Sequence, residues 1–214
     1  MGCPQISLNE LDYVVSTGYG RGAVEFADKT ITEIICHAKG AHFLIPSTRS
    51  IIDIGGQDAK AMEIDGEGNV LNFVMNDKCA AGTGRFLEVM AKVLGVRTVS
   101  KMGALALKSD EPCRISSTCT VFAETEVVVL RGEGKLREDL VAGVHKAVAS
   151  RVSVMAATLN FSPDAVFTGG VEKNIGVKNY LEEELGMAFR VPDEPQIVGA
   201  LGAALFAQSA KGGK

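Results

Sequence analysis

The sequence predicts a mixed α/β fold in which a small sheet is combined with a series of helices. Three observations lead to this prediction. Consecutive apolar segments of strand length are joined by tight glycine turns, later segments repeat their apolar residues with the period of a helix, and two more short apolar segments lie between the last helices. With 46% hydrophobic residues in 214, the chain is long enough to bury a core.

The first half of the chain contains a strand, a helix and a meander of strands. An apolar strand at residues 13–17 stops at the glycine-rich stretch Gly18-Tyr19-Gly20-Arg21-Gly22, and a helix is expected at residues 32–43. Strands follow at residues 50–54, 60–64 and 70–75. They are joined by the turns Gly55-Gly56-Gln57-Asp58 and Asp65-Gly66-Glu67-Gly68, and turns this tight are typical of antiparallel neighbours.

The second half of the chain is predicted to be mostly helical. Helices are expected at residues 83–94, 119–130 and 139–159. The last of these places one apolar face inward, formed by Leu140, Val144, Val148, Val152, Met155 and Leu159. A strand at residues 165–168, a helix at 174–185, a short strand at 188–191 and a closing helix at 196–208 complete the order.

The composition restricts the partners and the location of the protein. The net charge is −4, the basic residues are scattered and only 6% of residues are aromatic, which argues against a nucleic-acid partner. No apolar run approaches the roughly 20 residues that span a membrane, so we expect no membrane association and a cytoplasmic protein. The cysteines are Cys3, Cys36, Cys79, Cys113 and Cys119. An odd number in a reducing cytosol favours thiolate chemistry or burial over disulfides.

The first glycine turn carries groups suited to a phosphate. In Asp53-Ile54-Gly55-Gly56-Gln57-Asp58, an acid at a strand end precedes two residues without side chains. Backbone N–H groups in such a turn can approach phosphate oxygens, and the carboxylate can hold a hydrated Mg²⁺. A hairpin that only needs a positive φ is the alternative, and it is the better interpretation for an isolated turn.

A second glycine turn changes that balance. Val166-Phe167-Thr168-Gly169-Gly170-Val171-Glu172-Lys173-Asn174 runs from a strand into a helix, where a purine or ribose can pack on the backbone. The two turns, in this order and spacing, resemble the second phosphate loop and the adenosine loop of the actin, Hsp70 and sugar-kinase superfamily. The resemblance implies ATP and Mg²⁺ as ligands, with Asp53, Gln57 and Asp58 at the γ-phosphate. It implies nucleotide contacts from Gly55, Gly56, Gly169, Gly170, Lys173 and Asn174.

Two of the cysteines stand just ahead of predicted helices. Cys79 and Cys119 each precede a helix start, where positive potential lowers a thiol pKa and stabilises an anionic cluster. A [4Fe–4S] cluster normally takes four cysteines, so two per chain suggest a cluster that bridges two identical chains. Plain burial of both cysteines is the second interpretation. A zinc site with Cys113 and Cys119 is the third, because their spacing is looser than usual for zinc.

The motifs together resemble one ATPase family. The resemblance rests on five segments, which are the glycine-rich stretch, both glycine turns, Asn76-Asp77-Lys78-Cys79-Ala80-Ala81-Gly82-Thr83-Gly84-Arg85-Phe86 and Ser117-Thr118-Cys119-Thr120-Val121-Phe122-Ala123-Glu124. These segments are similar to those of the activators of 2-hydroxyacyl-CoA dehydratases, in the BadF/BadG/BcrA/BcrD-type family. The resemblance implies a homodimer with one [4Fe–4S] cluster held by Cys79 and Cys119. It also implies an ATP-driven one-electron transfer to a dehydratase component, with ferredoxin or flavodoxin as electron source. An ATP-binding subunit of a benzoyl-CoA reductase, a small-molecule kinase and a non-catalytic member of the fold are alternatives.

The resemblance also predicts the arrangement of lobes. Residues 1–49 correspond to a remnant of the first ATPase lobe, 50–195 to a complete second lobe with the cluster-bearing helices, and 196–214 to a helix returning toward the first lobe. Family members begin with a strand-turn-strand that contains Asp-x-Gly-Ser/Thr, and nothing before Tyr13 supplies it. We therefore expect an N-terminally truncated first lobe and weak ATP binding. His37 and His42, five residues apart, are expected to be structural or surface residues.

Overall fold

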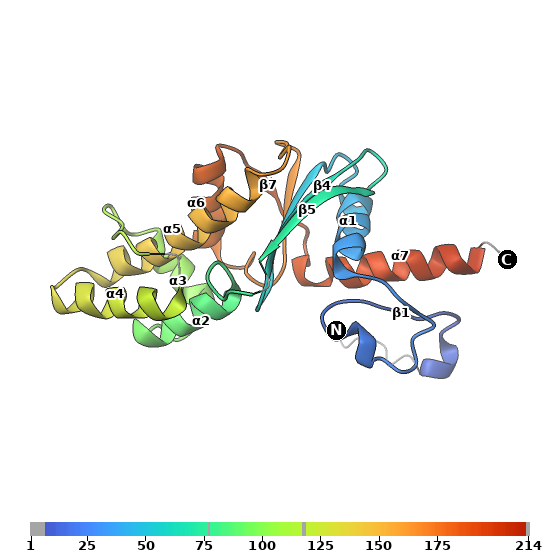
Figure 1. Ribbon diagram of the computed structural model, residues 1–214, viewed down its shortest axis with the longest axis horizontal. Helices are drawn as coiled ribbons and strands as arrows, with labels where there is room; N and C mark the ends of the chain where they lie inside the picture. Colours follow the sequence, from blue (N-terminus) through green and yellow to red (C-terminus); the bar gives the residue numbers. More distant parts are fainter. Residues whose placement is uncertain (1–6, 77, 117–118, 213–214) are drawn as a thin grey trace.

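The fold is a five-stranded mixed sheet with helices on both faces, and a small two-stranded sheet lies near the N-terminus (Figure 1). The computed structural model describes residues 7–76, 78–116 and 119–212. The strands of the large sheet lie in the order β5-β4-β3-β6-β7. Their bounds are β3 Ser50–Ile54, β4 Ala59–Ile64, β5 Val70–Asn76, β6 Ala165–Thr168 and β7 Phe189–Arg190. The predicted meander is confirmed, because β3, β4 and β5 pair antiparallel in sequence order.

Strand β3 is the centre of the sheet and every one of its residues is buried. It pairs antiparallel with β4 and parallel with β6. Asp53 near its end is flanked by Lys60 on β4 and by Thr168 on β6. The pairing therefore surrounds one acid in the middle of the sheet with polar neighbours on both sides.

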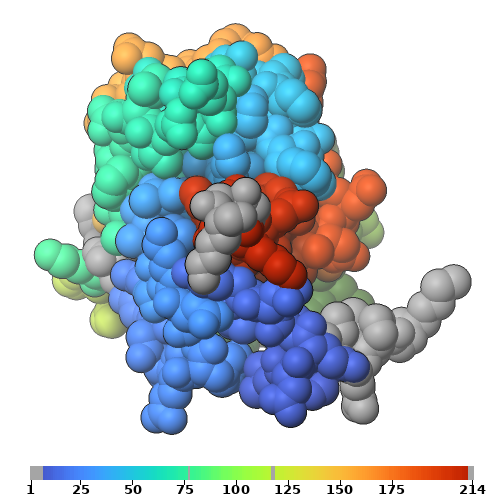
Figure 2. Space-filling view, turned by 90° about the vertical axis from the view of Figure 1, so that its right-hand side faces the viewer, coloured from blue at the N-terminus to red at the C-terminus, as the bar shows by residue number. Residues whose placement is uncertain are grey.

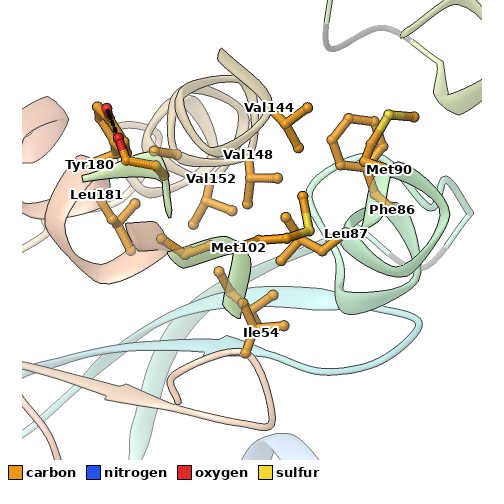
Figure 3. Close-up of a cluster of buried hydrophobic side chains, with 14 of the residues drawn as sticks. Ile54, Phe86, Leu87, Met90, Met102, Val144, Val148, Val152, Tyr180 and Leu181 are labelled. Carbon is orange, nitrogen blue, oxygen red and sulfur yellow. Dashed lines mark hydrogen bonds between the residues drawn. The ribbon is translucent and has the colours of Figure 1, made fainter. Parts of the chain in front are cut away.

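Within the described residues, five helices lie on one side of the sheet and enclose the larger core. They are α2 Gly84–Val93, α3 Val99–Ala106, α4 Thr120–Gly132, α5 Arg137–Ala156 and α6 Ile175–Leu185. Figure 3 shows Val144, Val148 and Val152 of α5 facing α2 and α3, with Ile54 of β3 nearby. The predicted inward face of α5 is confirmed at these positions. Helix α3 was not predicted, because an eight-residue helix depends on packing more than on its own periodicity.

The other side of the sheet is covered by α1 Glu33–Leu44 and α7 Val198–Gly212. Ala38 and Ala41 of α1 pack with Ile51, Met62 and Val166 of the sheet. The two helices touch so closely that a Cβ on Gly40 would overlap the Val198 carbonyl. The short helix η3 Pro195–Ile197 precedes α7, so the predicted closing helix begins two residues later than expected.

The N-terminal segment contains η1 Leu8–Glu10, β1 Val15–Ser16, η2 Arg21–Ala23 and β2 Lys29–Thr30. Strands β1 and β2 pair parallel, and β2 was not predicted because two residues carry no periodicity. Figure 2 shows this segment in blue beside α7 in red. The lobe boundaries at residues 49 and 195 stay predictions, and α1, from the expected first lobe, packs on the large sheet. Across the described residues, none of the helices is both long and apolar enough to cross a membrane.

Candidate functional site

A cavity of about 370 Å³ opens where the C-terminal ends of β3 and β6 meet. Ligands of α/β proteins commonly bind at this edge of the sheet. The predicted residues that line the cavity are Asp53, Gly55, Gly56, Gln57, Asp58, Gly169 and Gly170. Tyr19, Glu33, His37, Lys60 and Gln196 also line it, and no motif in the sequence had assigned them to a site. The two glycine turns are therefore brought to one place, as predicted.

The Asp53 carboxylate lies at the buried side of the cavity, and the residue is only 3% exposed. Its Oδ1 accepts a hydrogen bond from the Thr168 hydroxyl at 3.1 Å and lies 3.6 Å from His37 Nε2. Its Oδ2 lies 3.4 Å from the Lys60 ammonium. Both oxygens are contacted, so the orientation of the carboxylate is set before a ligand arrives.

Lys60 is a buried lysine that contacts two acids. Its ammonium lies 2.7 Å from Asp58 Oδ2, besides the contact with Asp53. Burial lowers the pKa of Lys60, but the carboxylates of Asp53 and Asp58 raise it by more, and the pKa ends above its usual value. The side chain is therefore charged at neutral pH, and the three groups together carry one net negative charge.

The first glycine turn is tied to the start of α2. Within the turn, the Gly55 N–H donates to the Asp58 carbonyl at 2.9 Å, so this amide is already used and is not free for a phosphate. The Gly84 and Arg85 N–H groups donate to the carbonyls of Gly55 and Gly56 at 2.9 and 2.8 Å. Two of the amides that a helix start leaves without helical partners are thus bonded to the turn.

The second glycine turn presses against Asp53. Gly169 has a φ of +93°, a conformation that L-residues rarely adopt. A Cβ at this position would overlap the Ile54 carbonyl oxygen and would lie 2.8 Å from Asp53 Oδ1. The Val171 N–H donates to the same Ile54 carbonyl at 3.2 Å. Glycine at position 169 therefore lets the second turn pack directly on the end of β3.

Lys173 and Asn174 are not among the residues that line the cavity. Lys173 is exposed and its ammonium lies 3.5 Å from Glu194. Asn174 is the N-cap residue of α6, one residue before the helix begins, and its Oδ1 accepts hydrogen bonds from the Gly176 and Val177 N–H groups. Its amide nitrogen donates to the Val99 carbonyl at 2.9 Å. The side chain is occupied in holding α3 and α6 together, and a contact with nucleotide stays a prediction for both residues.

A buried histidine completes the packing around Asn174. His145 of α5 is 0% exposed, with Nδ1 2.7 Å from the Val141 carbonyl and Nε2 3.1 Å from Asn174 Oδ1. Burial lowers the pKa of His145, and the two acceptors raise it by less. The imidazole is therefore neutral at neutral pH and can donate to only one of the two acceptors.

Helix α1 contributes two side chains that the sequence motifs did not indicate. Glu33 and His37 lie one helical turn apart and both face the cavity. Glu33 Oε2 lies 2.7 Å from the Arg21 guanidinium, and His37 Nε2 faces Asp53. The i,i+4 spacing of Glu33 and His37 was a usable signal. The spacing of five residues between His37 and His42 instead predicted that both are structural or surface residues.

The two predicted cluster ligands stand differently with respect to their helices. Cys119 is the N-cap residue of α4, as predicted. Cys79 lies four residues before Thr83, the N-cap residue of α2, in a loop where the Asn76 amide donates to the carbonyls of Cys79 and Ala81. Cys79 therefore stands ahead of α2, as predicted, and the turn through Ala80 to Thr83 lies between them.

The cysteines within the described residues are free thiols. Cys79, Cys113 and Cys119 are half-buried, and Cys36 is buried. Burial raises the pKa of the Cys36 and Cys113 thiols, which makes both poorer thiolates. Cys3 lies outside the described residues. In the part of the chain that the structure describes, no three His, Cys, Asp or Glu side chains are grouped to hold a metal ion.

Helices α2 and α4 bring the two cysteine segments to the same end of a helix pair. The helices pack against each other and run in the same direction (Figure 1). Near their C-terminal ends, the Arg131 guanidinium of α4 donates to the Val93 carbonyl of α2 at 3.1 Å. The loop with Cys79 and the N-cap Cys119 therefore both lie at the opposite end, where the two helices begin.

Comparison with known proteins finds relatives over most of the chain. The chain is 50% identical over 202 residues to the 2-hydroxyisocaproyl-CoA dehydratase activator of Clostridioides difficile, covering 94% of this chain and 76% of the relative. It is 49% identical over 199 residues to the (R)-2-hydroxyglutaryl-CoA dehydratase activating ATPase of Acidaminococcus fermentans, covering 92% and 76%. A subunit of the benzoyl-CoA reductase of Thauera aromatica is 32% identical over 208 residues, covering 94% and 73%.

The fold is shared with a solved activator. The structure of the activator of the 2-hydroxyisocaproyl-CoA dehydratase from Clostridium difficile with bound ADPNP superposes with a TM-score of 0.92 at 50% identity, covering 97% of this chain and 78% of that one. The predicted actin, Hsp70 and sugar-kinase type of α/β fold is confirmed by this likeness. The model of the BadF/BadG/BcrA/BcrD ATPase family matches residues 4–207. The chain belongs to the BadF/BadG/BcrA/BcrD ATPase family.

Proposed function

We propose that this protein is an ATP-dependent activator of a 2-hydroxyacyl-CoA dehydratase. It hydrolyses ATP and uses the reaction to pass one low-potential electron to the dehydratase component. The proposal rests on one observation, which is that the two glycine turns and Asp53 line the same cavity. The chain that contains this cavity is 50% and 49% identical to two such activators. The identity to the benzoyl-CoA reductase subunit is 32%, which makes that role the second candidate.

The nucleotide is assigned to the cavity at the ends of β3 and β6. Gly55 and Gly56 form the side for the phosphates, and Gly169 and Gly170 form the side for the adenosine. Asp53 orients the attacking water, whose oxygen bonds to the γ-phosphorus as the bond to ADP breaks. Carboxylates are ligands that Mg²⁺ prefers, so Asp53 and Asp58 suit a hydrated ion that arrives with the phosphates. Gln57 and Asp58 line the γ-phosphate side.

Two hydrogen bonds support a link between the nucleotide and the cysteines. The carbonyls of Gly55 and Gly56 hold the first two amides of α2, and α2 follows the loop with Cys79. A shift of this turn when the γ-phosphate leaves would therefore move the start of α2. Since α2 packs along α4, the same shift reaches Cys119.

The cysteine pair fits a cluster shared by two chains. Cys79 and Cys119 are free thiols at the same end of the α2–α4 pair, so two protomers can supply the four thiolates of a [4Fe–4S] cluster. Such a cluster supplies the one-electron chemistry, with ferredoxin or flavodoxin as its electron source. Helix α4 exposes apolar side chains that suit a contact between protomers. Those more than half exposed are Val121, Phe122, Val128 and Val129.

Anaerobic purification tests the proposal directly. We expect a brown dimer with about four irons and four sulfides per two chains. With a reduced electron donor and the dehydratase component, the protein should reduce its partner only while ATP is hydrolysed. A colourless protein that hydrolyses ATP would place the chain among ATPases without electron transfer. A brown protein that reduces benzoyl-CoA reductase instead would favour the second candidate.

A further inference from the structure

The floor of the candidate nucleotide cavity contains a fixed cation, the ammonium of Lys60. The side chain is 3% exposed, and β4 places it directly across from Asp53 on β3. Its nitrogen lies 2.7 Å from Asp58 Oδ2 and 3.4 Å from Asp53 Oδ2. A cation that contacts one oxygen of each of two carboxylates occupies the place from which a metal ion would bridge them.

We propose that Lys60 is a positioning residue that holds the carboxylates of Asp53 and Asp58 and keeps a divalent cation from bridging them directly. The metal ion then enters the cavity only with the phosphates of the nucleotide. This inference rests on the proposed ATPase site and adds to it the way in which the metal ion is admitted.

The contacts of Asp53 show why the lysine matters. Thr168 and His37 contact Oδ1, and Lys60 contacts Oδ2. Removal of the ammonium therefore frees Oδ2 of Asp53 and Oδ2 of Asp58 at the same time. Two unpaired carboxylate oxygens are a suitable ligand set for Mg²⁺ or Mn²⁺.

The charges in the cavity also support a role for Lys60 in keeping a metal ion out. Lys60 leaves one net negative charge on its group with Asp53 and Asp58, and Glu33 at the cavity wall is paired with Arg21. Without the lysine, two neighbouring buried carboxylates would repel each other. A metal ion could compensate them, but it would then be bound to the protein before the nucleotide arrives.

The test is the variant Lys60→Met, which keeps an unbranched side chain one atom shorter and removes its charge. Mn²⁺ is titrated into nucleotide-free protein, and the free ion is measured by electron paramagnetic resonance. We expect Lys60→Met to bind one more Mn²⁺ per chain than the wild type. Lys146→Met, at a half-exposed lysine near Glu183, is the matched control and should bind as the wild type does.

Kinetics give a second measurement. Because Asp53 loses a contact that orients it, kcat for ATP hydrolysis should fall by about 100-fold. KM for ATP should change by no more than about threefold, since a positioning residue does not bind the substrate itself. A raised KM with an unchanged kcat would make Lys60 a direct phosphate ligand and would overturn the proposal.

The double variant Lys60→Met with Asp58→Asn covers the case in which the single variant does not fold. It removes one positive and one negative charge, so the net charge of the group is unchanged, and only Asp53 remains as a carboxylate. It should bind no additional Mn²⁺. Additional Mn²⁺ in the double variant, wild-type kcat in it, or no additional Mn²⁺ in a folded Lys60→Met protein would each overturn the proposal. The Mn²⁺ titration needs neither hydrolysis nor a cluster, so its result is independent of the proposed function.

Discussion

Gly169→Ala should damage both the stability of the protein and the candidate nucleotide site. Gly169 has a φ of +93°, and the new Cβ would overlap the Ile54 carbonyl and approach Asp53 Oδ1 to 2.8 Å. Gly134→Ala is the matched control, because Gly134 has a φ of +85° and no atom lies within 4 Å of its Cβ position. The two variants share the backbone strain, and only the first adds a steric overlap.

The expected magnitudes follow from these two effects. A left-handed conformation costs an L-residue roughly 1–2 kcal/mol, which is the expected loss for Gly134→Ala. Overpacking a well-packed position costs a further ~1–3 kcal/mol, so Gly169→Ala should lose about 2–5 kcal/mol. The excess of Gly169→Ala over its control, about 1–3 kcal/mol, measures the overlap.

Urea unfolding of both variants measures the free energy of unfolding, and calorimetric titration with ATP measures nucleotide affinity. Gly134→Ala should bind ATP as the wild type does. In Gly169→Ala, displacement of the second turn and of Asp53 should weaken binding and slow hydrolysis. If the two variants lose the same free energy and Gly169→Ala hydrolyses ATP normally, then the close packing of the second turn on β3 has no part in the site.

Three further predictions concern the cluster, the acid and the buried histidine. Cys79→Ser or Cys119→Ser should lose the iron of anaerobically purified protein and weaken the dimer, whereas Cys113→Ser should keep both; the opposite pattern would move the ligand assignment to Cys113. Asp53→Asn should lower kcat more than ATP affinity, and an equal loss of the two would make Asp53 a structural residue. Because burial lowers the pKa of His145 below 6.5, its value unfolded, protons bind the unfolded chain more readily. The free energy of unfolding should therefore fall as the pH drops below about 6.5, and a rise there would show an imidazolium that donates to both Val141 and Asn174.

Much of the fold was readable from the sequence. The strands at 50–54 and 165–168 were predicted with the bounds of β3 and β6, because short apolar runs between turn residues are strong local signals. Helix α3 and strand β2 were not predicted. Both are short, and their stability comes from neighbours distant in sequence: α3 packs on α5 and α6, and β2 pairs with β1.

The candidate site shows the same division. The glycine turns at Gly55-Gly56 and Gly169-Gly170 were recognised because a turn needs its special residues within a few positions of each other. Lys60 was not predicted as a site residue, because only the register of β3 against β4 places it opposite Asp53. His37 was missed because its importance depends on the packing of α1 beside the end of β3.

The sequence by itself determined the class of fold, the two glycine turns, the acid between them and the cysteines that stand ahead of helical segments. These features are local, since each depends on residue types within about ten positions. Only the tertiary structure decided that Lys60 contacts both acids, that Asn174 is occupied in capping α6, and that the segments of Cys79 and Cys119 share one end of a helix pair. Strand register and helix packing are set by contacts between distant segments, and periodicity along the chain does not encode which segments meet.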